Sequence, residues 1–226
     1  MKYTNLFGVE IEGLWTANID TMHIPHTSVT TDGSIHISSS EYEDNTAKER
    51  EVQTSPQKLD ATLQTIDALM PYLLYANATC GFHVHVSLKD RNDYFWLTQA
   101  DFMPLFVKTM VRKFPELRKR TRNTYCKAKY SDDAGSIIQA QYVDKSKSGV
   151  RYHAVNFCNA LHGTIEFRFF GAEQIVKDKD CLREYVLATY SFIEDYLAKV
   201  PKKRVIAELS ANQYPSGELL KLPELS

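Results

Sequence analysis

Cys80-Gly81-Phe82-His83-Val84-His85-Val86-Ser87 alternates apolar and polar residues over the length of a single β-strand. Successive side chains of a strand point to opposite faces of its sheet, so the large apolar residues of this segment share one face. His83 and His85 share the other face. The segment therefore predicts a strand with an apolar side that packs on a core and a polar side that carries two imidazoles.

Three segments far away in the chain show the same alternation. They span residues 7–12, 49–54 and 164–169. Their polar faces carry several ionisable side chains: Glu10 and Glu12 in the first, Glu49 and Glu51 beside Gln53 in the second, and Glu166 and Arg168 in the third. The apolar face of the third is expected to hold Ile165, Phe167 and Phe169. Charged groups on one side only of separate strands indicate a sheet with one functional face.

The composition is that of an ordinary globular protein. The chain has 226 residues, of which 43% are hydrophobic, and its formal net charge is -1. This length suits one sizeable core, and the charge balance indicates neither a broad nucleic-acid surface nor an acidic disordered tail. We therefore expect a single domain over residues 1–226, with a motif-bearing core at 6–200 and a tail at 201–226 whose role the sequence does not indicate.

The ends and the cysteines favour a cytoplasmic protein. No apolar run approaches the roughly 18 residues that span a membrane. The first strand begins almost at once, which leaves no room for a signal peptide. The four cysteines are widely spaced, without a C-x-x-C pair, which favours free thiols in a reducing compartment.

Apolar residues at helical spacing predict three helices. The first runs from Pro56 to about Ala76, the second from about residue 94 to 114, and the third from Asp178 or Asp180 to about Val200. Residues 35–37 are consistent with a short strand. The basic segment at 113–129 is interpreted as a solvated helix end rather than an anion site, and residues 131–149 as a long loop of the kind that serves as a lid or binding segment.

Glu10 and Glu12 lie about 6.5 to 7 Å apart along one strand face, so their carboxylates can share one cation or flank two. Oxygen-rich sites suit Mg²⁺ or Mn²⁺, and Mg²⁺ usually completes its coordination with phosphate oxygens. If the strands are neighbours, three further side chains would enlarge the cluster: Glu51, Glu166 and either His83 or His85.

Arg168 lies on the same face as Glu166 and offers a fork of donors for phosphate or carboxylate, and Arg151 could add a second. Taken one at a time, these residues have ordinary explanations. A Glu-x-Glu pair is commonly the solvated side of an edge strand, and Asp32 is interpreted as a turn residue. Their joint occurrence favours a site, because so many carboxylates on one face repel one another unless a cation is present.

Six segments together resemble the amidoligase family, which comprises carboxylate–amine ligases related to glutamine synthetase and glutamate–cysteine ligase. In chain order they are residues 7–12, Asp32-Gly33-Ser34, Glu51-Val52-Gln53-Thr54-Ser55-Pro56, residues 80–86, residues 151–156 and residues 163–168. The resemblance covers about residues 7–170. Neither a P-loop nor a Rossmann glycine motif is present, so phosphate binding of those two types is not expected.

The resemblance implies an α+β fold like the glutamine synthetase catalytic domain: a curved, mainly antiparallel sheet whose concave polar face is the active site, with helices packed on the convex face. It implies an ATP- and Mg²⁺-dependent ligase, with Mn²⁺ as an alternative ion. A carboxylate substrate attacks the γ-phosphate to give an acyl phosphate, and an amine converts it into an amide or peptide-like bond.

The resemblance also implies residue roles. Metal ligands are expected at Glu10, Glu12, Glu51, His83 and Glu166. Catalytic contacts are expected at Arg168, Arg151 and His85, and cofactor contacts at His83, Asn156 and Arg168. The chain is much shorter than glutamine synthetase and has no obvious extra N-terminal domain, so the substrate pocket and the quaternary arrangement cannot be borrowed.

Two alternatives stay open. His83-x-His85 with a glutamate also suits a cupin-like metal-dependent hydrolase or oxygenase that binds Fe²⁺ or Zn²⁺ without nucleotide. A non-catalytic binding protein that kept the fold is the other. For the ligase, the expected partners are small-molecule or peptide carboxylates and amines and no membrane. Nucleic acid is not indicated but stays open as an acceptor, and so does the oligomeric state.

Overall fold

The computed structural model of the chain describes residues 5–38, 40–130, 151–158, 163–176, 178 and 180–200. In this part, seven strands form one open sheet in the order β2-β3-β1-β5-β7-β6, with β4 pairing to the end of β1. Every pairing is antiparallel. The strands are β1 (Leu6–Trp15), β2 (Thr27–Thr30), β3 (Lys48–Thr54), β4 (Leu73–Tyr75), β5 (Gly81–Ser87), β6 (Val155–Asn156) and β7 (Ile165–Gly171). The expected α+β class with an antiparallel sheet is confirmed.

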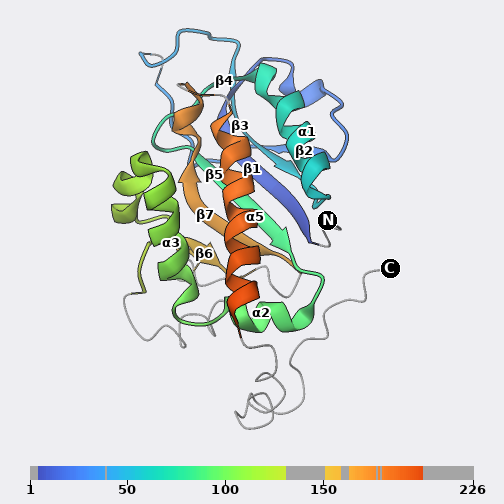
Figure 1. Ribbon diagram of the computed structural model, residues 1–226. Coiled ribbons are helices and arrows are strands. Elements are labelled where there is room, and N and C mark those ends of the chain that lie inside the picture. The colour runs from blue at the N-terminus through green and yellow to red at the C-terminus, as the bar shows by residue number, and fades with distance from the viewer. Residues whose placement is uncertain are drawn as a thin grey trace.

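Helices cover one face of this sheet, and the longest, α5, runs across its middle between α1 and α3 (Figure 1). The α-helices are α1 (Leu59–Leu69), α2 (Arg91–Leu97), α3 (Phe102–Lys113) and α5 (Cys181–Lys199). Short 3-10 turns follow several elements: η1 (Ile19–Thr21), η2 (Met70–Tyr72), η3 (Pro115–Arg122) and η5 (Ala172–Val176). Within the described ranges, no helix combines the length and the apolar character needed to cross a bilayer.

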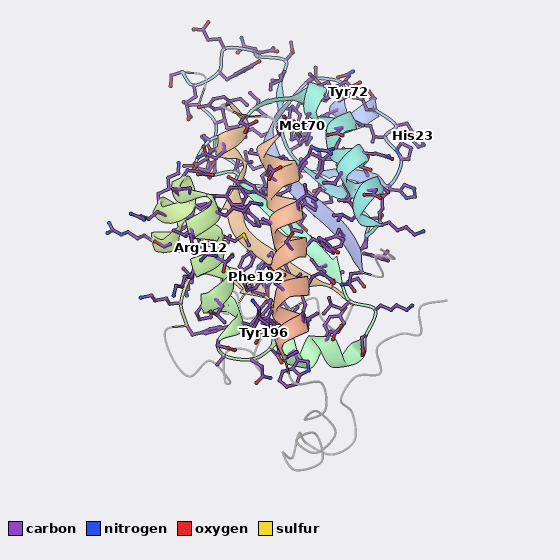
Figure 2. All side chains as sticks on the ribbon, in the orientation of Figure 1. His23, Met70, Tyr72, Arg112, Phe192 and Tyr196 are labelled. Carbon is purple, nitrogen blue, oxygen red and sulfur yellow. The ribbon has the colours of Figure 1, made fainter. Side chains whose placement is uncertain are left out.

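Aromatic side chains join α3, α5 and β7 on the covered face. Phe192 and Tyr196 of α5 lie on the side of that helix toward α3 (Figure 2). Their ring centroids lie 5.4 and 4.9 Å from that of Phe102. Phe106 lies 4.9 Å from Phe167, so the core connects both helices to the sheet.

The polar side chains meet because β1 lies between β3 and β5. Glu10 is paired in register with His83 on β5 and with Gln53 on β3, and Glu12 is paired with Glu51. On the other side of β5, His85 is paired with Glu166. The predicted functional residues therefore lie on adjacent strands, as the shared alternation requires.

The register of β7 contains an irregularity that alternation alone does not predict. Pairing with β5 shifts by one residue between Phe82 and Val84, which leaves a β-bulge at residues 168 and 169. After Phe167, the next aromatic contact with the helices comes from Phe170, which stacks on Tyr185 at 4.5 Å. Phe169 is fully buried in the core, as alternation predicts, and the bulge adds Phe170 as a further buried residue opposite Phe82.

The helix predicted from Pro56 to Ala76 is shorter than expected. It begins at Leu59 and ends at Leu69, and Met70–Tyr72 forms a 3-10 turn before β4. Pro71 explains this end because proline lacks a backbone N–H and clashes with the carbonyl four residues earlier. The apolar residues after it belong to the strand.

The other predicted elements have mixed outcomes. The helical region at 94–114 consists of two helices, α2 and α3, and the last predicted helix is confirmed as α5. No strand forms at residues 35–37. None of the four cysteines, which all lie in the described part, forms a disulfide. The loop predicted at 131–149 and the tail at 201–226 lie outside the described residues.

Candidate metal and anion site

A first group of potential metal ligands comes from three neighbouring strands. Nδ1 of His83 lies 2.8 Å from Oε2 of Glu10 and 3.2 Å from Oε1 of Glu166. One ligand atom of each residue lies within 4.8 Å of the others. His83 and Glu166 are about 5% and 3% exposed, so this group is nearly closed to solvent. Two carboxylates and one imidazole at these separations can hold a cation.

A second group lies beside the first and contains Glu12, Asp32 and Glu51, again with ligand atoms within 4.8 Å of one another. Glu12 links the groups, because its Oε1 lies 3.9 Å from Nε2 of His83. Its Oε2 accepts a hydrogen bond of 2.6 Å from the backbone N–H of Gly81. The two groups therefore form one continuous acidic surface.

Asp32 is the residue that the sequence analysis missed as a possible ligand. Its carboxylate does accept the Ser34 N–H at 2.8 Å, as a turn residue should. It also follows β2, whose Thr30 is paired with Glu51, and so the turn projects toward the second group. The signal was an aspartate directly after a short strand, but its use requires knowing that β2 pairs with β3.

Arg168 supplies positive charge to this face. Its guanidinium donates a hydrogen bond to Oε1 of Glu166. Nε of Arg168 is buried and, among the described residues, has no hydrogen-bond partner. The guanidinium carbon lies 5.9 Å from the centroid of the Tyr152 ring, and that of the exposed Arg151 lies 5.4 Å from the same ring. Two cations thus approach from the β6 side, one buried and one at the rim.

A cavity of about 310 Å³ lies between the acidic groups and the arginines. Its lining is mostly polar and comes from five segments of the chain: Glu10, Glu51, Gln53, Arg151, Asn156, Cys158, Glu166 and Arg168. Of the predicted site residues, six line this cavity directly. Glu12 and His83 contribute to the ligand groups beside it instead.

His85 and Asn156 have defined places around this cavity. Nε2 of His85 lies 3.0 Å from Oε1 of Glu10, in a close contact that lacks hydrogen-bond geometry. The side-chain amide of Asn156 donates a hydrogen bond of 2.7 Å to Oε2 of Glu166. All nine residues predicted for the site therefore lie on or beside this one region of the sheet.

The electrostatics of this face are those of a site prepared for positive charge. Burial raises the pKa of Glu10, but the hydrogen bond with His83, the close contact with His85 and the charges of both rings outweigh it and hold the pKa well below its ordinary value. Burial raises the pKa of Glu51 to about 7, and the nearby charges of Glu10 and Glu12 add to this shift.

The two carboxylates beside His83 favour its protonated form. Burial and the Arg168 charge lower its pKa, but hydrogen bonding of the ring to Glu10 and Glu166 reverses the shift and raises the pKa to about 9. The ring therefore acts as an internal cation between two carboxylates. A metal ion that displaces this proton would take over the same role.

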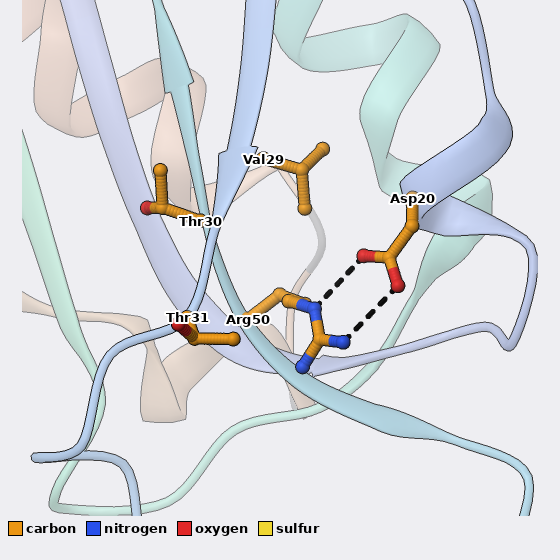
Figure 3. Close-up of a pocket in the computed structure, with 5 residues that line it drawn as sticks. All are labelled: Asp20, Val29, Thr30, Thr31 and Arg50. Atoms are coloured by element: carbon orange, nitrogen blue, oxygen red, sulfur yellow. Dashed lines mark hydrogen bonds and ion pairs between the residues drawn. The ribbon is translucent and has the colours of Figure 1, made fainter.

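A second cavity, of about 450 Å³, lies elsewhere, beside β2 and β3 (Figure 3). Asp20 and Arg50 lie on its wall, with Nε of Arg50 2.8 Å from Oδ1 of Asp20. Lys48 adds a contact of 2.7 Å to the same carboxylate. Both cations thus pair with the same carboxylate, and the cavity shares no residue with the polar cavity described above.

Comparison with known proteins adds no assignment: no protein-family model matches the chain, and no curated protein matches it.

Proposed function

We propose that this protein is an ATP- and Mg²⁺-dependent carboxylate–amine ligase of the amidoligase type, with a glutamine synthetase-like catalytic domain. It forms an amide or peptide-like bond between small-molecule or peptide substrates. The observation that carries this proposal is the convergence of two acidic groups and two arginines around one cavity. Their residues come from segments spread between positions 10 and 168.

The donor set fits Mg²⁺ or Mn²⁺ bound together with phosphate. Carboxylate oxygens dominate both groups, and one imidazole is present, whereas thiolates are absent from them. Mg²⁺ binds few protein ligands and completes its coordination with phosphates and water. The unsatisfied Nε of Arg168 beside the cavity is a donor suited to an anionic partner.

The ligands in this proposal are Glu10, His83 and Glu166 at one cation position and Glu12, Asp32 and Glu51 at the other. A bound metal ion supplies neutralisation of the phosphate charge during transfer.

Arg168 binds the transferring phosphoryl group through donors that Glu166 leaves available, and Arg151 binds at the rim. Glu166 and His83 fix the guanidinium and the carboxylates before substrate arrives, which reduces reorganisation during the reaction. The substrate carboxylate forms a bond to the γ-phosphorus as the bond to ADP breaks. The amine then attacks the acyl carbon, and inorganic phosphate is the leaving group of this second step.

The cupin-like alternative has less support than the ligase. A cupin needs a closed double-sheet arrangement, whereas β2 and β6 lie at opposite edges of the sheet formed by the described strands. The oxygen-rich second group also suits Fe²⁺ or Zn²⁺ less well than Mg²⁺.

The proposal is tested first by calorimetric titration with ATP in the presence of Mg²⁺. Turnover is then measured with a panel of carboxylates, using hydroxylamine as a general amine so that an acyl phosphate is trapped as a hydroxamate. We expect ATP binding that depends on the metal, and hydroxamate and ADP formed in equal amounts. Metal analysis of the purified protein tests the cupin alternative.

Glu166→Gln is the matched site variant, and Asp20→Asn, in the second cavity, is the matched control. The proposal requires that Glu166→Gln loses hydroxamate formation while Asp20→Asn keeps it. Wild-type protein that binds no ATP with Mg²⁺ contradicts the proposal. ATP binding without any ADP release across the panel would favour the non-catalytic binding protein.

A further inference from the structure

Two uncharged amide side chains lie beside the two acidic groups, one on each side. Asn156, on β6, donates to Glu166 of the first group. Gln53, on β3, donates to Oε1 of Glu51 of the second group. Both amides line the polar cavity. Each therefore contacts one carboxylate of one group, and their strands, β6 and β3, are separated in the sheet by β1, β5 and β7.

The orientation of the Asn156 amide is fixed by its surroundings. Its Oδ1 accepts the backbone N–H of Cys158 at 3.0 Å, so its Nδ2 must point the other way, toward Glu166. Asn156 is about 2% exposed, and its rotamer is therefore held by packing as well. Oε1 of Glu166 contacts Arg168 and His83, so both oxygens of this carboxylate are held.

Gln53 has an equivalent place in the second group. It lies two residues after Glu51 on the same strand face and is paired in register with Glu10. Its hydrogen bond favours the charged form of Glu51 and opposes the effect of burial on that carboxyl. Unlike Asn156, it is only half-buried, so replacing it carries little risk for folding.

An amide is well suited to this work because it donates a hydrogen bond without adding a positive charge. A lysine or arginine in the same place would orient the carboxylate but would also compete with a cation for it. Residues that orient metal ligands typically change metal affinity about 10–100-fold when they are replaced.

We propose that Asn156 and Gln53 are positioning residues for two separately tunable cation positions, Asn156 through Glu166 and Gln53 through Glu51. The inference rests on the proposed function, because it requires a bound cation at each acidic group. It goes beyond that function because it gives each position its own supporting residue.

The test uses Mn²⁺ alone as the probe, in titrations of the full chain followed by electron paramagnetic resonance. Asn156→Leu and Gln53→Met keep the approximate side-chain volume and remove the donor. Glu166→Gln and Glu51→Gln identify which of the two binding events belongs to which group. We expect Asn156→Leu to weaken, about 10–100-fold, only the event that Glu166→Gln weakens, and Gln53→Met only the event that Glu51→Gln weakens.

Gln57→Met is the matched control, because its amide bonds to Thr65 away from the cavity. It should leave both Mn²⁺ binding events unchanged. The thermal unfolding of metal-free Gln53→Met should match that of the wild-type protein. The inference is overturned if the amide variants leave Mn²⁺ binding unchanged, or if each weakens both events equally, as general loosening of the fold would. Wild-type protein that binds no Mn²⁺ contradicts both the inference and the proposed function. Amide variants that bind Mn²⁺ as the wild type does contradict the inference alone.

Discussion

The two faces of the central sheet are held by different forces. On the helix face, the side chains of β5 and β7 pack against aromatic rings of α3 and α5. On the other face, the same two strands carry His83 and Glu166, which are buried as charged partners. Strand alternation thus places a cohesive apolar layer directly behind a charged one.

This contrast separates stability from function. Burial of apolar surface contributes about 25 cal/mol per Å², whatever the partner, so the aromatic face is a general source of folding energy. Buried charges cost free energy unless each has a suitable partner, and such pairs contribute little net stability. We therefore expect substitutions on the helix face to change stability most and those on the polar face to change binding most.

The largest effect on stability should come from Phe106→Ala. Phe106 is fully buried and packs against both Phe167 and Phe170. Its removal leaves a cavity, and we expect a loss of about 3–5 kcal/mol in the free energy of unfolding, measured with urea. A loss no larger than that of Glu10→Gln would break the distinction between the faces.

The largest effect on activity should come from Glu10→Gln. Glu10 contacts both imidazoles and belongs to the first acidic group. We expect hydroxamate formation to fall by about 100-fold or more, because a neutral amide neither neutralises a cation nor holds the imidazoles as firmly. The urea midpoint should move less than for Phe106→Ala. Unchanged turnover in an active enzyme would contradict this assignment.

The pH dependence of Mn²⁺ binding should distinguish the two acidic groups. In the metal-free protein, Glu51, with a pKa of about 7, must lose its proton before it can bind, so affinity at its group should rise with pH and level off above about 7. His83, with a pKa of about 9, must also lose a proton, so affinity at the first group should continue to rise to about pH 9. Titrations from pH 6 to about 9.5 test both, and a common midpoint would contradict the separation.

The smallest effect should come from Asp20→Asn in the second cavity. Asp20 pairs with Arg50 and Lys48, and none of these three residues lines the polar cavity. We expect neither Mn²⁺ affinity nor hydroxamate formation to change measurably. A clear loss of either would mean that the two cavities are not independent of each other.

Much of this arrangement could be predicted from the sequence because alternation is a local property. The polar faces of three distant segments predicted that Glu10, His83 and Glu166 share one side of a sheet, and the register brings them together. Alternation does not say which strands are neighbours. The contribution of Asp32 depended on such a pairing, and so it was interpreted only as a turn.

Other features failed for equally specific reasons. Helical periodicity after Pro56 continues through Pro71, but the proline ends the helix whatever the periodicity around it. The bulge in β7 falls in Phe-Arg-Phe-Phe, where Phe169 and Phe170 are both fully buried, so alternation alone does not show that Phe170 is the residue paired with Phe82.

The position of β1 has a consequence for how the chain is made. Among the strands of this sheet β1 is synthesised first, yet Glu10 pairs with His83, which is translated 73 residues later, and Glu166 comes later still. Neither neighbour of β1 in the sheet exists when it emerges, so the N-terminal segment spends much of synthesis as an incomplete strand. The centre of the sheet can therefore form only after the later strands are synthesised. Pairing between residues so far apart in the sequence favours slow folding.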